Sequence, residues 1–528
     1  MGVKINFTYK VLIASAGLGN RLKGMTKNIN KALISVAHKP AISYIIEKFE
    51  KDIEIVIAVG YKSKSIKDYL SIAYPDRKIT FVEVDKYEGE GSGLGYSILQ
   101  CKKHLQCPFV FSSNDTIVLE DIKPPTYNWM GQTDLIDNSQ YRSIVASKNE
   151  VKEIRAKNYK GNSKAYIGLA GIYNYKEFWK SMEEGINEGS IEIGESFGLR
   201  SLIPLGISLF DFTWFDTGNI EKLKKTREYF SKANDYNILE KEEEAIWFQN
   251  NKVIKFSIDR NFIENRVQRA KSLDKYIPKV ISSSENMYAY KKVNGDVFSK
   301  FPSVSNFKYL LNWMKGFWQS KELSTNQEKE FYKTCNSFYK EKTYKRVQQF
   351  FISLERFDTE EIINGVQTPK IFELLDKVDW NFISKGKPVR FHGDLHFENI
   401  LINNNSDQPF TLLDWRQDFG GNMDYGDIYY DFAKLNHGFI ISHQIIDQNQ
   451  FQVETNLDNI KYDFHRTQNL IDCEKYFMEW IQEFGYDYNK VQIMTALIFL
   501  NIAALHHYPY NKLLFYLGKS MLNKHISL

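Results

Sequence analysis

Residues 389–416 read VRFHGDLHFENILINNNSDQPFTLLDWR, and they predict a strand–loop–strand unit built for phosphoryl transfer. An apolar run leads into the loop that holds Asp394 and Asn399, and a second apolar run leads directly to Asp414. Phosphoryl transfer from a nucleotide uses such groups, because one carboxylate orients the attacking hydroxyl and accepts its proton while an amide and a second carboxylate hold magnesium. The stretch therefore indicates an enzyme that uses a nucleotide and Mg²⁺.

Size and composition place this unit within a larger, near-neutral protein. A chain of 528 residues exceeds what one core supports, so two or three domains are expected. The 69 Lys and Arg side chains nearly balance the 65 Asp and Glu, which argues against a nucleic-acid partner. The four cysteines form no CxxC pair, and neither a long apolar run nor a signal-peptide pattern occurs. We therefore expect a cytoplasmic protein with reduced thiols, without a zinc site or membrane insertion, and of undetermined oligomeric state.

The first part of the chain alternates predicted strands with predicted helices. This order is typical of an α/β domain with a mostly parallel sheet and helices on both faces, in which ligands bind in the loops after the carboxyl ends of the strands. The predicted strands span residues 10–16, 53–59, 79–84 and 109–112, and predicted helices span 41–49 and 220–232.

A polar, acidic stretch at residues 234–244 separates this part from the rest, so we predict domains at 1–235 and 241–528. The second domain has an α+β pattern, in which a small sheet comes first and a mainly helical region follows from residue 306. Its expected elements are strands at 245–248, 252–258 and 288–293, a hairpin-like turn between the first two, and a helix at 262–273.

A glycine-rich loop follows the first predicted strand. It carries Gly17, Gly19, Asn20 and Arg21, and Lys31 comes ten residues after Arg21. Glycines at this position let backbone N–H groups approach a triphosphate, and the two cations are partners for phosphate oxygens. The simpler interpretation is a tight turn between strand and helix, but the position after a buried strand favours phosphate binding.

Residues 11–49 resemble the opening of the nucleotide-sugar-type nucleotidyltransferases, whose signature is G-x-G-[ST]-R followed by a lysine within P-K. Asn20 departs from this signature in place of Ser or Thr, and Asn30 stands where proline is usual. The resemblance continues to about residue 230 and implies a Rossmann-like fold. It also implies that the segment containing Gly91 and Ser92 contacts the nucleobase.

Two carboxylates, Asp115 and Asp216, follow apolar runs that are far apart in the sequence. Such a pair can share one Mg²⁺ over a triphosphate, so that a phosphomonoester attacks the α-phosphorus directly and pyrophosphate leaves. The resemblance implies the same roles, with Asp115 as the first metal ligand and Asp216 as the second. The alternatives are a helix N-cap for Asp115 and a turn residue for Asp216.

Residues 241–528 resemble the aminoglycoside phosphotransferase and choline kinase group, which has a protein-kinase-like fold. The family form H-G-D-x-H-x-x-N followed by [IL]-D-[FW] is present in full. The resemblance implies that Asp394 takes the proton of the acceptor hydroxyl and that Asn399 and Asp414 ligate Mg²⁺. It also implies an ATP-phosphate lysine at Lys255.

Further roles follow from the same resemblance. Glu264 is expected to pair with the phosphate lysine, for which a surface ion pair is the alternative, and Tyr290 is expected in the hinge that contacts the base. His392 and His396 are expected to brace the catalytic loop through hydrogen bonds, and Asp427 and Asp431 to support it. Phe397-Glu398 replaces the usual Pro-Gly, and Arg416 is interpreted as forming a surface ion pair rather than meeting an anionic group on the acceptor.

Together these features predict a bifunctional transferase. A small hydroxyl compound, with a sugar or polyol favoured, would be phosphorylated by ATP and would then receive a nucleoside monophosphate from CTP or UTP, giving a precursor for surface polysaccharide. One alternative is a choline kinase and phosphocholine cytidylyltransferase that makes CDP-choline. Others are an antibiotic-type phosphotransferase with an inactive N-terminal domain and a non-enzymatic nucleotide sensor.

Overall fold

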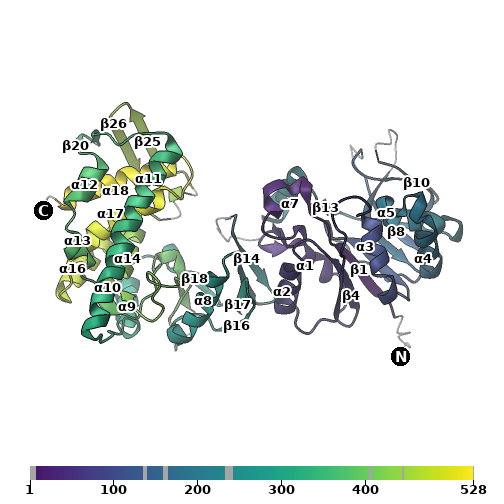
Figure 1. Cartoon of the computed structure of the whole chain (residues 1–528), viewed down its shortest axis with the longest axis horizontal. Coiled ribbons are helices and arrows are strands. Elements are labelled where there is room, and N and C mark those ends of the chain that lie inside the picture. Colours follow the sequence, from purple (N-terminus) through teal and green to yellow (C-terminus); the bar gives the residue numbers. More distant parts are fainter. Residues whose placement is uncertain are drawn as a thin grey trace. The chain divides into compact units, whose positions relative to one another are not determined.

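The computed structural model describes residues 8–134, 139–157, 164–231, 242–403, 407–442, 445–446 and 448–526, which form two compact units (Figure 1). The first unit ends at Arg260 but also contains Ile281–Tyr290, and the second contains Asn261–Val280 and the chain from Lys291 onward. The predicted boundary between residues 235 and 241 lies outside the described residues.

A nine-stranded sheet forms the centre of the first unit, in the order β5-β4-β1-β6-β11-β8-β12-β10-β9. Strands β5, β4, β1 and β6 run parallel, as predicted, whereas the pairings of β11 are antiparallel and the sheet becomes mixed beyond β6. The strands are β1 Lys10–Ser15, β4 Glu54–Val59, β5 Ile79–Glu83, β6 Phe109–Ser113, β8 Trp129–Thr133, β9 Ser143–Ser147, β10 Glu150–Arg155, β11 Lys164–Ile172 and β12 Ser208–Asp211.

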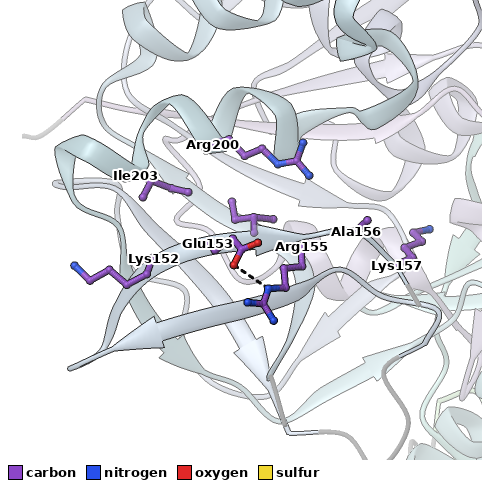
Figure 2. Close-up of a pocket in the computed structure, with 8 residues that line it drawn as sticks. Lys152, Glu153, Arg155, Ala156, Lys157, Arg200 and Ile203 are labelled. Atoms are coloured by element: carbon purple, nitrogen blue, oxygen red, sulfur yellow. Dashed lines mark hydrogen bonds and ion pairs between the residues drawn. The ribbon is translucent and has the colours of Figure 1, made fainter. Parts of the chain in front are cut away.

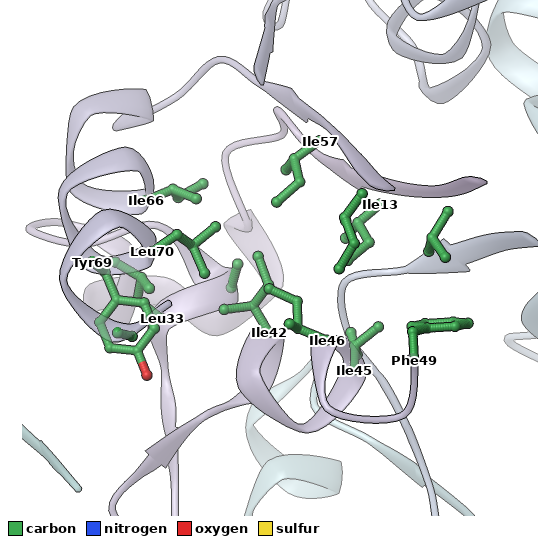
Figure 3. Close-up of a cluster of buried hydrophobic side chains, with 14 of the residues drawn as sticks. Ile13, Leu33, Ile42, Ile45, Ile46, Phe49, Ile57, Ile66, Tyr69 and Leu70 are labelled. Carbon is green, nitrogen blue, oxygen red and sulfur yellow. The ribbon is translucent and has the colours of Figure 1, made fainter. Parts of the chain in front are cut away.

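Helices cover both faces of this sheet because alternate residues of the buried strands point to opposite sides. Val11 and Ile13 of β1 pack into one apolar cluster with helices α1 and α2, and Figure 3 shows Ile13 beside Ile42 and Ile46 in this cluster. Leu12 packs into the opposite cluster with helices α3, α4 and α6. The helices are α1 Ala41–Ile46, α2 Ser63–Ala73, α3 Leu94–Gln100, α4 Tyr175–Glu184, α5 Ser190–Ile193, α6 Glu195–Ser201 and α7 Ile220–Ser231.

A second, four-stranded sheet in the order β14-β15-β17-β16 was expected to belong to the C-terminal domain, yet it packs mainly into the first unit. The hairpin-like turn is confirmed, because Asn250 and Asn251 both have positive φ, as a two-residue hairpin turn requires. Trp247 and Ile254 join the apolar cluster of α1 and α2, and Lys252 Nζ donates to the carbonyl of Ile72 over 2.6 Å. The strands are β14 Glu244–Gln249, β15 Lys252–Ser257, β16 Val280–Ser283 and β17 Met287–Lys291.

Trp247 anchors this sheet to the first unit. Its side chain is fully buried, its ring meets Tyr69 edge-on at 5.1 Å, and its Nε1 donates to the Leu33 carbonyl over 3.1 Å. We expect Trp247→Ala to destabilise the first unit by about 3–5 kcal/mol, because a large buried ring and its hydrogen bond are both lost. Differential scanning calorimetry of the full chain measures this, with the exposed Leu205→Ala as the control. Equal transition temperatures for the two variants would contradict the anchoring role.

The second unit is largely helical and holds the segment that includes Asp394. That segment lies between strand β21, Pro388–Val389, and a three-stranded sheet in the order β18-β22-β23. None of the helices in the described parts of the chain is both long and apolar enough to cross a membrane. The main elements are α8 Arg260–Leu273, β18 Gly295–Val297, α9 Val304–Phe317, α10 Thr325–Asn336, η8 Ser337–Glu341, α11 Lys342–Leu354, α12 Ile371–Lys377, α13 Trp380–Ser384, η9 Phe397–Asn399, β22 Ile400–Asn403, β23 Phe410–Leu412, α14 Ile428–Ile440, α16 Gln468–Glu483, α17 Tyr488–Ala503 and α18 Tyr510–Ile526.

The helical region also contains a four-stranded sheet that the sequence analysis missed. Its order is β20-β19-β26-β25, so two hairpins that are distant in the chain join through a parallel pairing. The strands are β19 Glu361–Ile363, β20 Val366–Thr368, β25 Phe451–Asn456 and β26 Asn459–Phe464.

Candidate active sites

The glycine loop follows β1 at the carboxyl edge of the large sheet. Gly19 has a φ of 74°, and a Cβ there would lie 2.9 Å from Thr26 Cγ2 and 3.1 Å from Lys31 Cβ, so the turn requires glycine. A Cβ at Gly17 would meet nothing within 4 Å, which leaves this part of the backbone open. Asn20 and Arg21 are exposed at the start of the following 3₁₀ helix, Asn20–Thr26.

Asn30 stands where proline is usual, and its side-chain hydrogen bonds hold the turn that precedes Lys31. Its buried side-chain amide donates to the carbonyls of Ser15, at 3.1 Å, and Tyr61, at 2.7 Å, and its oxygen accepts from Ala32 N at 2.9 Å. The side chain thus ties the end of β1 to the turn that presents Lys31.

Asp115 and Asp216 converge because two short strands pair in antiparallel register. Strand β7, Thr116–Val118, begins just after Asp115, and strand β13, Trp214–Asp216, ends at Asp216, which lies opposite Thr116. A Cβ at Gly218 would lie 2.9 Å from Asp115 Oδ2 and 2.9 Å from Asp216 Oδ1, so both carboxylates approach one point. Two carboxylates so placed fit the oxygen donors that Mg²⁺ prefers.

Cations meet Asp115 in the same place. Lys31 Nζ lies 3.2 Å from Asp115 Oδ2, and Arg21 Nη2 lies 4.0 Å from the same oxygen. The structure therefore brings together Arg21, Lys31, Asp115 and Asp216, all of which the sequence analysis singled out. No group of three or more His, Cys, Asp or Glu side chains arranged to bind a metal occurs within the described ranges.

The environments of the two carboxylates push their pKa values in opposite directions. Burial alone would raise the pKa of Asp115, but Lys31 and the hydroxyl of Ser113 lower it below its ordinary value. Burial and the neighbouring charge of Asp115 raise the pKa of Asp216. Tyr141, which the sequence analysis did not identify, donates its hydroxyl to Asp216. A divalent cation between the carboxylates would relieve the repulsion that raises the pKa of Asp216.

Gly91 and Ser92 lie in the loop between β5 and α3, at the same edge of the sheet as the glycine loop. Gly91 has a φ of 72°, and a Cβ there would lie 2.9 Å from Lys86 Nζ. Ser92 Oγ donates to the carbonyl of Gly89 over 2.6 Å and stabilises the turn. Their contact with a nucleobase stays a prediction.

A cationic pocket of about 830 Å³ lies along β10. Figure 2 shows Lys152, Arg155 and Arg200 around it, with Glu153 paired to Arg155. The pocket also includes Lys157, whose pKa is lowered first by burial and then by the positive charge of Arg21. The sequence signal for Lys157 was its position two residues beyond a strand, which is too common to single out one lysine.

In the second unit, Asp394 lies at the centre of a hydrogen-bonded loop. Lys434 Nζ of α14 lies 2.9 Å from Asp394 Oδ1, while Asn399 Nδ2 donates over 3.4 Å to Oδ2 and over 2.9 Å to the Asp394 carbonyl. His396 Nε2 lies 3.7 Å from Asp394 Oδ2. Lys434 was not predicted from the sequence, because nothing in a helical pattern 40 residues beyond Asp394 marks one lysine as its partner.

Asp414 is held beside this loop. The N–H of Leu413 donates to the carbonyl of Asn399 over 2.7 Å, and Asp414 itself has a φ of 57°, a conformation that few residues other than glycine adopt. Arg266 Nη1 of α8 lies 3.4 Å from Asp414 Oδ1. Asn399 directly precedes β22 and Asp414 follows β23, which pairs with β22, and both residues carry oxygens of the type that Mg²⁺ takes.

Neighbouring charges set the pKa values of the loop. Burial would raise the pKa of Asp394, yet Lys434 and His396 hold it well below its ordinary value. Burial lowers and Asp394 raises the pKa of His396, and the net result is about 9. His392 is buried, which lowers its pKa to about 3 and keeps it neutral. A neutral His392 whose Nδ1 accepts from Asp394 N over 3.3 Å agrees with the predicted bracing role.

Asp431 and Asp427, which were expected to support the catalytic loop, accept hydrogen bonds from the backbone in and before that loop. Asp431 accepts hydrogen bonds from the N–H groups of His392, at 2.8 Å, and Gly393, at 2.7 Å. Asp427 accepts from Lys387 N at 2.9 Å, at the entrance to the preceding strand. These contacts fix the backbone on which Asp394 lies.

The unusual Phe397-Glu398 pair has a structural explanation. The Phe397 ring is buried and packs against Phe298, at 4.9 Å, and Phe439, at 5.1 Å. Glu398 Oε2 lies 2.9 Å from His396 Nδ1. The Phe397 ring therefore anchors the loop to the apolar core, and Glu398 forms an ion pair within the loop.

A buried arginine in α8 also holds the loop. Arg269 donates to the carbonyls of Phe391, at 2.6 Å, Met423, at 3.1 Å, and Arg416, and its guanidinium lies 3.9 Å from the centre of the Phe391 ring. Burial lowers its pKa to about 9. Arg269 therefore joins three segments that surround Asp394 and Asp414.

Replacing this arginine tests that role. We expect Arg269→Met to lower the free energy of unfolding by about 2–4 kcal/mol, because three carbonyls lose their partner inside the protein. Thermal unfolding of the full chain, followed by calorimetry, measures the effect. The exposed Lys271→Met on the same helix is the control, and a shift no larger than that of the control would contradict the role.

The remaining predicted kinase residues lie on both sides of the unit boundary. Lys255 is buried in β15 and Tyr290 is buried in β17, both in the first unit. Glu264 is exposed on α8 in the second unit. The chain passes from the first unit to the second directly after Tyr290. The contact of Tyr290 with the base and the pairing of Lys255 with Glu264 stay predictions.

Comparison with known proteins finds a different relationship for each part of the chain. The model of the phosphotransferase enzyme family (APH) matches residues 347–450, which include Asp394, Asn399 and Asp414. The N-terminal region matches nucleotidyltransferases in sequence.

Two such relatives differ in how much of the chain they match. "Bifunctional protein GlmU" of Methanocaldococcus jannaschii is 29% identical over 244 residues, which cover 44% of this chain and 57% of that protein. "Choline-phosphate cytidylyltransferase" of Streptococcus pneumoniae is 40% identical over 108 residues, or 20% of this chain and 44% of that protein. The chain thus spans about half the length of the curated relatives it matches.

Among solved structures, CTP:phosphocholine cytidylyltransferase from Streptococcus pneumoniae aligns with a TM-score of 0.36 and 20% identity. The alignment covers 42% of this chain and 98% of that structure.

Proposed function

We propose that this chain, whose N-terminal region matches nucleotidyltransferases and whose C-terminal region matches the phosphotransferase enzyme family, catalyses two successive steps. The C-terminal domain, residues 241–528, phosphorylates a small hydroxyl compound with ATP. The N-terminal domain, residues 1–235, transfers a nucleoside monophosphate from CTP or UTP to the new phosphate. The product is a nucleotide-activated sugar or polyol for surface glycan synthesis.

The observation that carries the proposal is that one chain holds two complete sets of groups for phosphate chemistry. In one set, Asp115 and Asp216 approach a single point beside Lys31. In the other, Asp394 contacts Asn399 on a loop adjoining Asp414. An inactive N-terminal domain or a nucleotide sensor would not need both sets intact.

In the kinase step, Asp394 is placed to orient the acceptor hydroxyl and accept its proton. Lys434 and His396 keep the pKa of this carboxyl low, so it is ionised at neutral pH and acts mainly by orientation while the proton is transferred late. Bound Mg²⁺, held by Asn399 and Asp414, would supply charge neutralisation on the nucleotide phosphates.

In the nucleotidyl transfer step, the chain offers cations and an open backbone rather than a protein nucleophile. Arg21 and Lys31 lie where they can contact phosphate oxygens, and the backbone near Gly17 is open to a ligand. Asp115 and Asp216 would hold Mg²⁺, which stabilises charge on the α-phosphate as pyrophosphate leaves.

A second candidate, the synthesis of CDP-choline, is favoured by one observation. A segment of 108 residues is 40% identical to a choline-phosphate cytidylyltransferase of Streptococcus pneumoniae. It would require a kinase pocket that accepts a quaternary ammonium, for which aromatic faces without neighbouring cations are suited.

A coupled assay tests the proposal. Purified full-length protein is given Mg²⁺, ATP, CTP or UTP, and a panel of sugars, polyols and choline, and ADP and pyrophosphate are followed separately. Both products with one acceptor would support the two steps and identify the substrate. ADP alone would contradict the N-terminal assignment, and pyrophosphate from supplied phosphorylated acceptors without ADP would contradict the C-terminal one.

A further inference from the structure

Two cationic side chains near the catalytic loop, Arg416 and Lys342, have no role in the proposed chemistry and form no ion pair with a described carboxylate. Arg416 follows Asp414-Trp415 and packs against Gly393, the residue before Asp394. A Cβ atom placed on Gly393 would lie only 2.7 Å from Arg416 Cβ. Its Nε donates to the backbone carbonyl of Asp418 over 3.0 Å, and no described carboxylate lies within ion-pair distance of its guanidinium. The expected surface ion pair is therefore not formed among these residues.

Lys342, the first residue of α11, lies beside Arg416. Both cations contact the ring of Phe338, with Lys342 Nζ at 4.3 Å and the Arg416 guanidinium carbon at 4.9 Å from its centre. Lys342 is half-buried, yet none of the carboxylates that the structure describes pairs with it. Burial lowers the pKa of this ammonium, and the nearby Arg416 lowers it further although Tyr430 opposes the shift.

The cluster of Lys342, Arg416, Phe338 and Tyr430 is continuous with the catalytic base. Lys342 Nζ lies 5.8 Å from the centre of the Tyr430 ring, and Tyr430 precedes Lys434 by one turn of α14. Lys434 contacts Asp394 Oδ1, whereas Asn399 contacts Oδ2. The Tyr430 ring thus lies between Lys342 and the helix α14 that carries Lys434, and the charges of Lys342, Arg416, Lys434 and Asp394 all act on the Tyr430 hydroxyl.

This arrangement is unfavourable unless an anion completes it. Two uncompensated cations placed together in a half-buried site repel each other, and an anionic ligand turns that cost into charge-assisted hydrogen bonds. A cationic ligand would add a further positive charge. The Phe338 ring supplies an apolar wall. Burial would raise the pKa of the Tyr430 hydroxyl, but the positive charges of Lys342, Lys434 and Arg416 lower it below its ordinary value.

We propose that the hydroxyl compound phosphorylated at Asp394 carries an anionic group, a carboxylate or a phosphate, which Lys342 and Arg416 bind. The inference rests on the proposed kinase function and specifies its acceptor. A sugar acid, a polyol acid or a polyol phosphate fits this description. Choline, an amino sugar and an aminoglycoside do not.

Small hydroxyl compounds that carry a negative, a neutral or a positive group test the inference. ADP formation by full-length protein with Mg²⁺ and ATP is measured for glucuronate, glucose and glucosamine, and for glycerate, glycerol 3-phosphate, glycerol and choline. We expect kcat/KM to be highest for an anionic acceptor and lowest for the two cationic ones, glucosamine and choline. Lys342→Met and Arg416→Met are each expected to lower kcat/KM for the anionic acceptor about ten- to a hundredfold, with KM for ATP unchanged.

A neighbouring lysine provides the control for these substitutions. Lys345→Met removes an exposed lysine from the same helix and should leave every rate unchanged, while Lys342→Arg should restore most of the preference. The inference would be overturned if a neutral or cationic acceptor had the highest kcat/KM. It would also be overturned if the two variants raised KM for ATP and left the acceptor preference unchanged, because the cations would then bind the nucleotide. ADP from no acceptor would instead count against the kinase assignment itself and remove the inference with it.

Discussion

Asp394→Asn is expected to abolish ADP formation while pyrophosphate release at the other site continues at the wild-type rate. The substitution removes the group that orients the acceptor hydroxyl and takes its proton, which costs about a hundred- to ten-thousandfold in rate. Asn retains the size of the side chain, and the backbone of the loop stays held by Asp431. The loss should therefore appear in kcat for the kinase step, with little change in thermal stability.

The measurement needs both half-reactions in one preparation. ADP is followed with ATP and the acceptor, and pyrophosphate is followed with CTP or UTP and the chemically phosphorylated acceptor. Asp424→Asn, which changes an exposed carboxylate near the same loop, is the matched control. Undiminished ADP formation by Asp394→Asn would mean that another group is the base, and loss of both products would mean that the two sites are not independent.

Asp115→Asn is expected to have the converse effect and to abolish pyrophosphate release. It removes one of the two carboxylates that approach the same point near Gly218, and it leaves Lys31 without its partner. Loss of one such charged group from a preorganised site costs at least about a hundredfold in rate. The apparent affinity for Mg²⁺ in the pyrophosphate assay should fall as well, because only Asp216 remains.

A second substitution separates a metal effect from general damage. Gly218→Ala adds a methyl group 2.9 Å from both carboxylates without changing any charge, so it should impair the same half-reaction. The exposed Asp121→Asn serves as the control. If Asp115→Asn kept wild-type pyrophosphate release at saturating Mg²⁺, Asp115 would be no more than a turn residue.

The sequence predicted the strands that position both sites because those strands carry strong local signals. Buried strands β1, β4 and β6 are uninterrupted apolar runs, and the residues after them are the glycines and the aspartate that the pattern singled out. The turn at Asn250 and Asn251 was equally readable, because asparagine tolerates positive φ. Such features depend on neighbours in the chain.

Features that depend on distant contacts were not predictable in this way. The partner of Asp394 is Lys434, and the residue that ties the loop together is Arg269, yet neither position differs in sequence from an ordinary helical cation. The sheet of β19, β20, β25 and β26 joins hairpins about 90 residues apart. The alternation of Phe451, Val453 and Thr455 was a visible strand signal, but β19 and β20 are too short to show one.

The placement of the small sheet was missed for a related reason. Its strands resemble those of a kinase, so the sequence assigned them to the C-terminal domain, whereas packing is decided by which surface their apolar side chains meet. Trp247, Ile254 and Phe256 pack into the apolar cluster of the first unit. Sequence resemblance reflects the common origin of these strands, whereas the burial of their side chains shows which part of this chain they pack against.

That shared core has a consequence for how such a gene could be divided. If the reading frame were split in the polar stretch around residue 241, the downstream product would begin with strands whose apolar face had lost its cover. Trp247, Met287 and Ala289, all fully buried in the intact chain, would then face water. Neither product would inherit a self-sufficient kinase, and fission at this point would be selected against even though both sets of catalytic residues survived it.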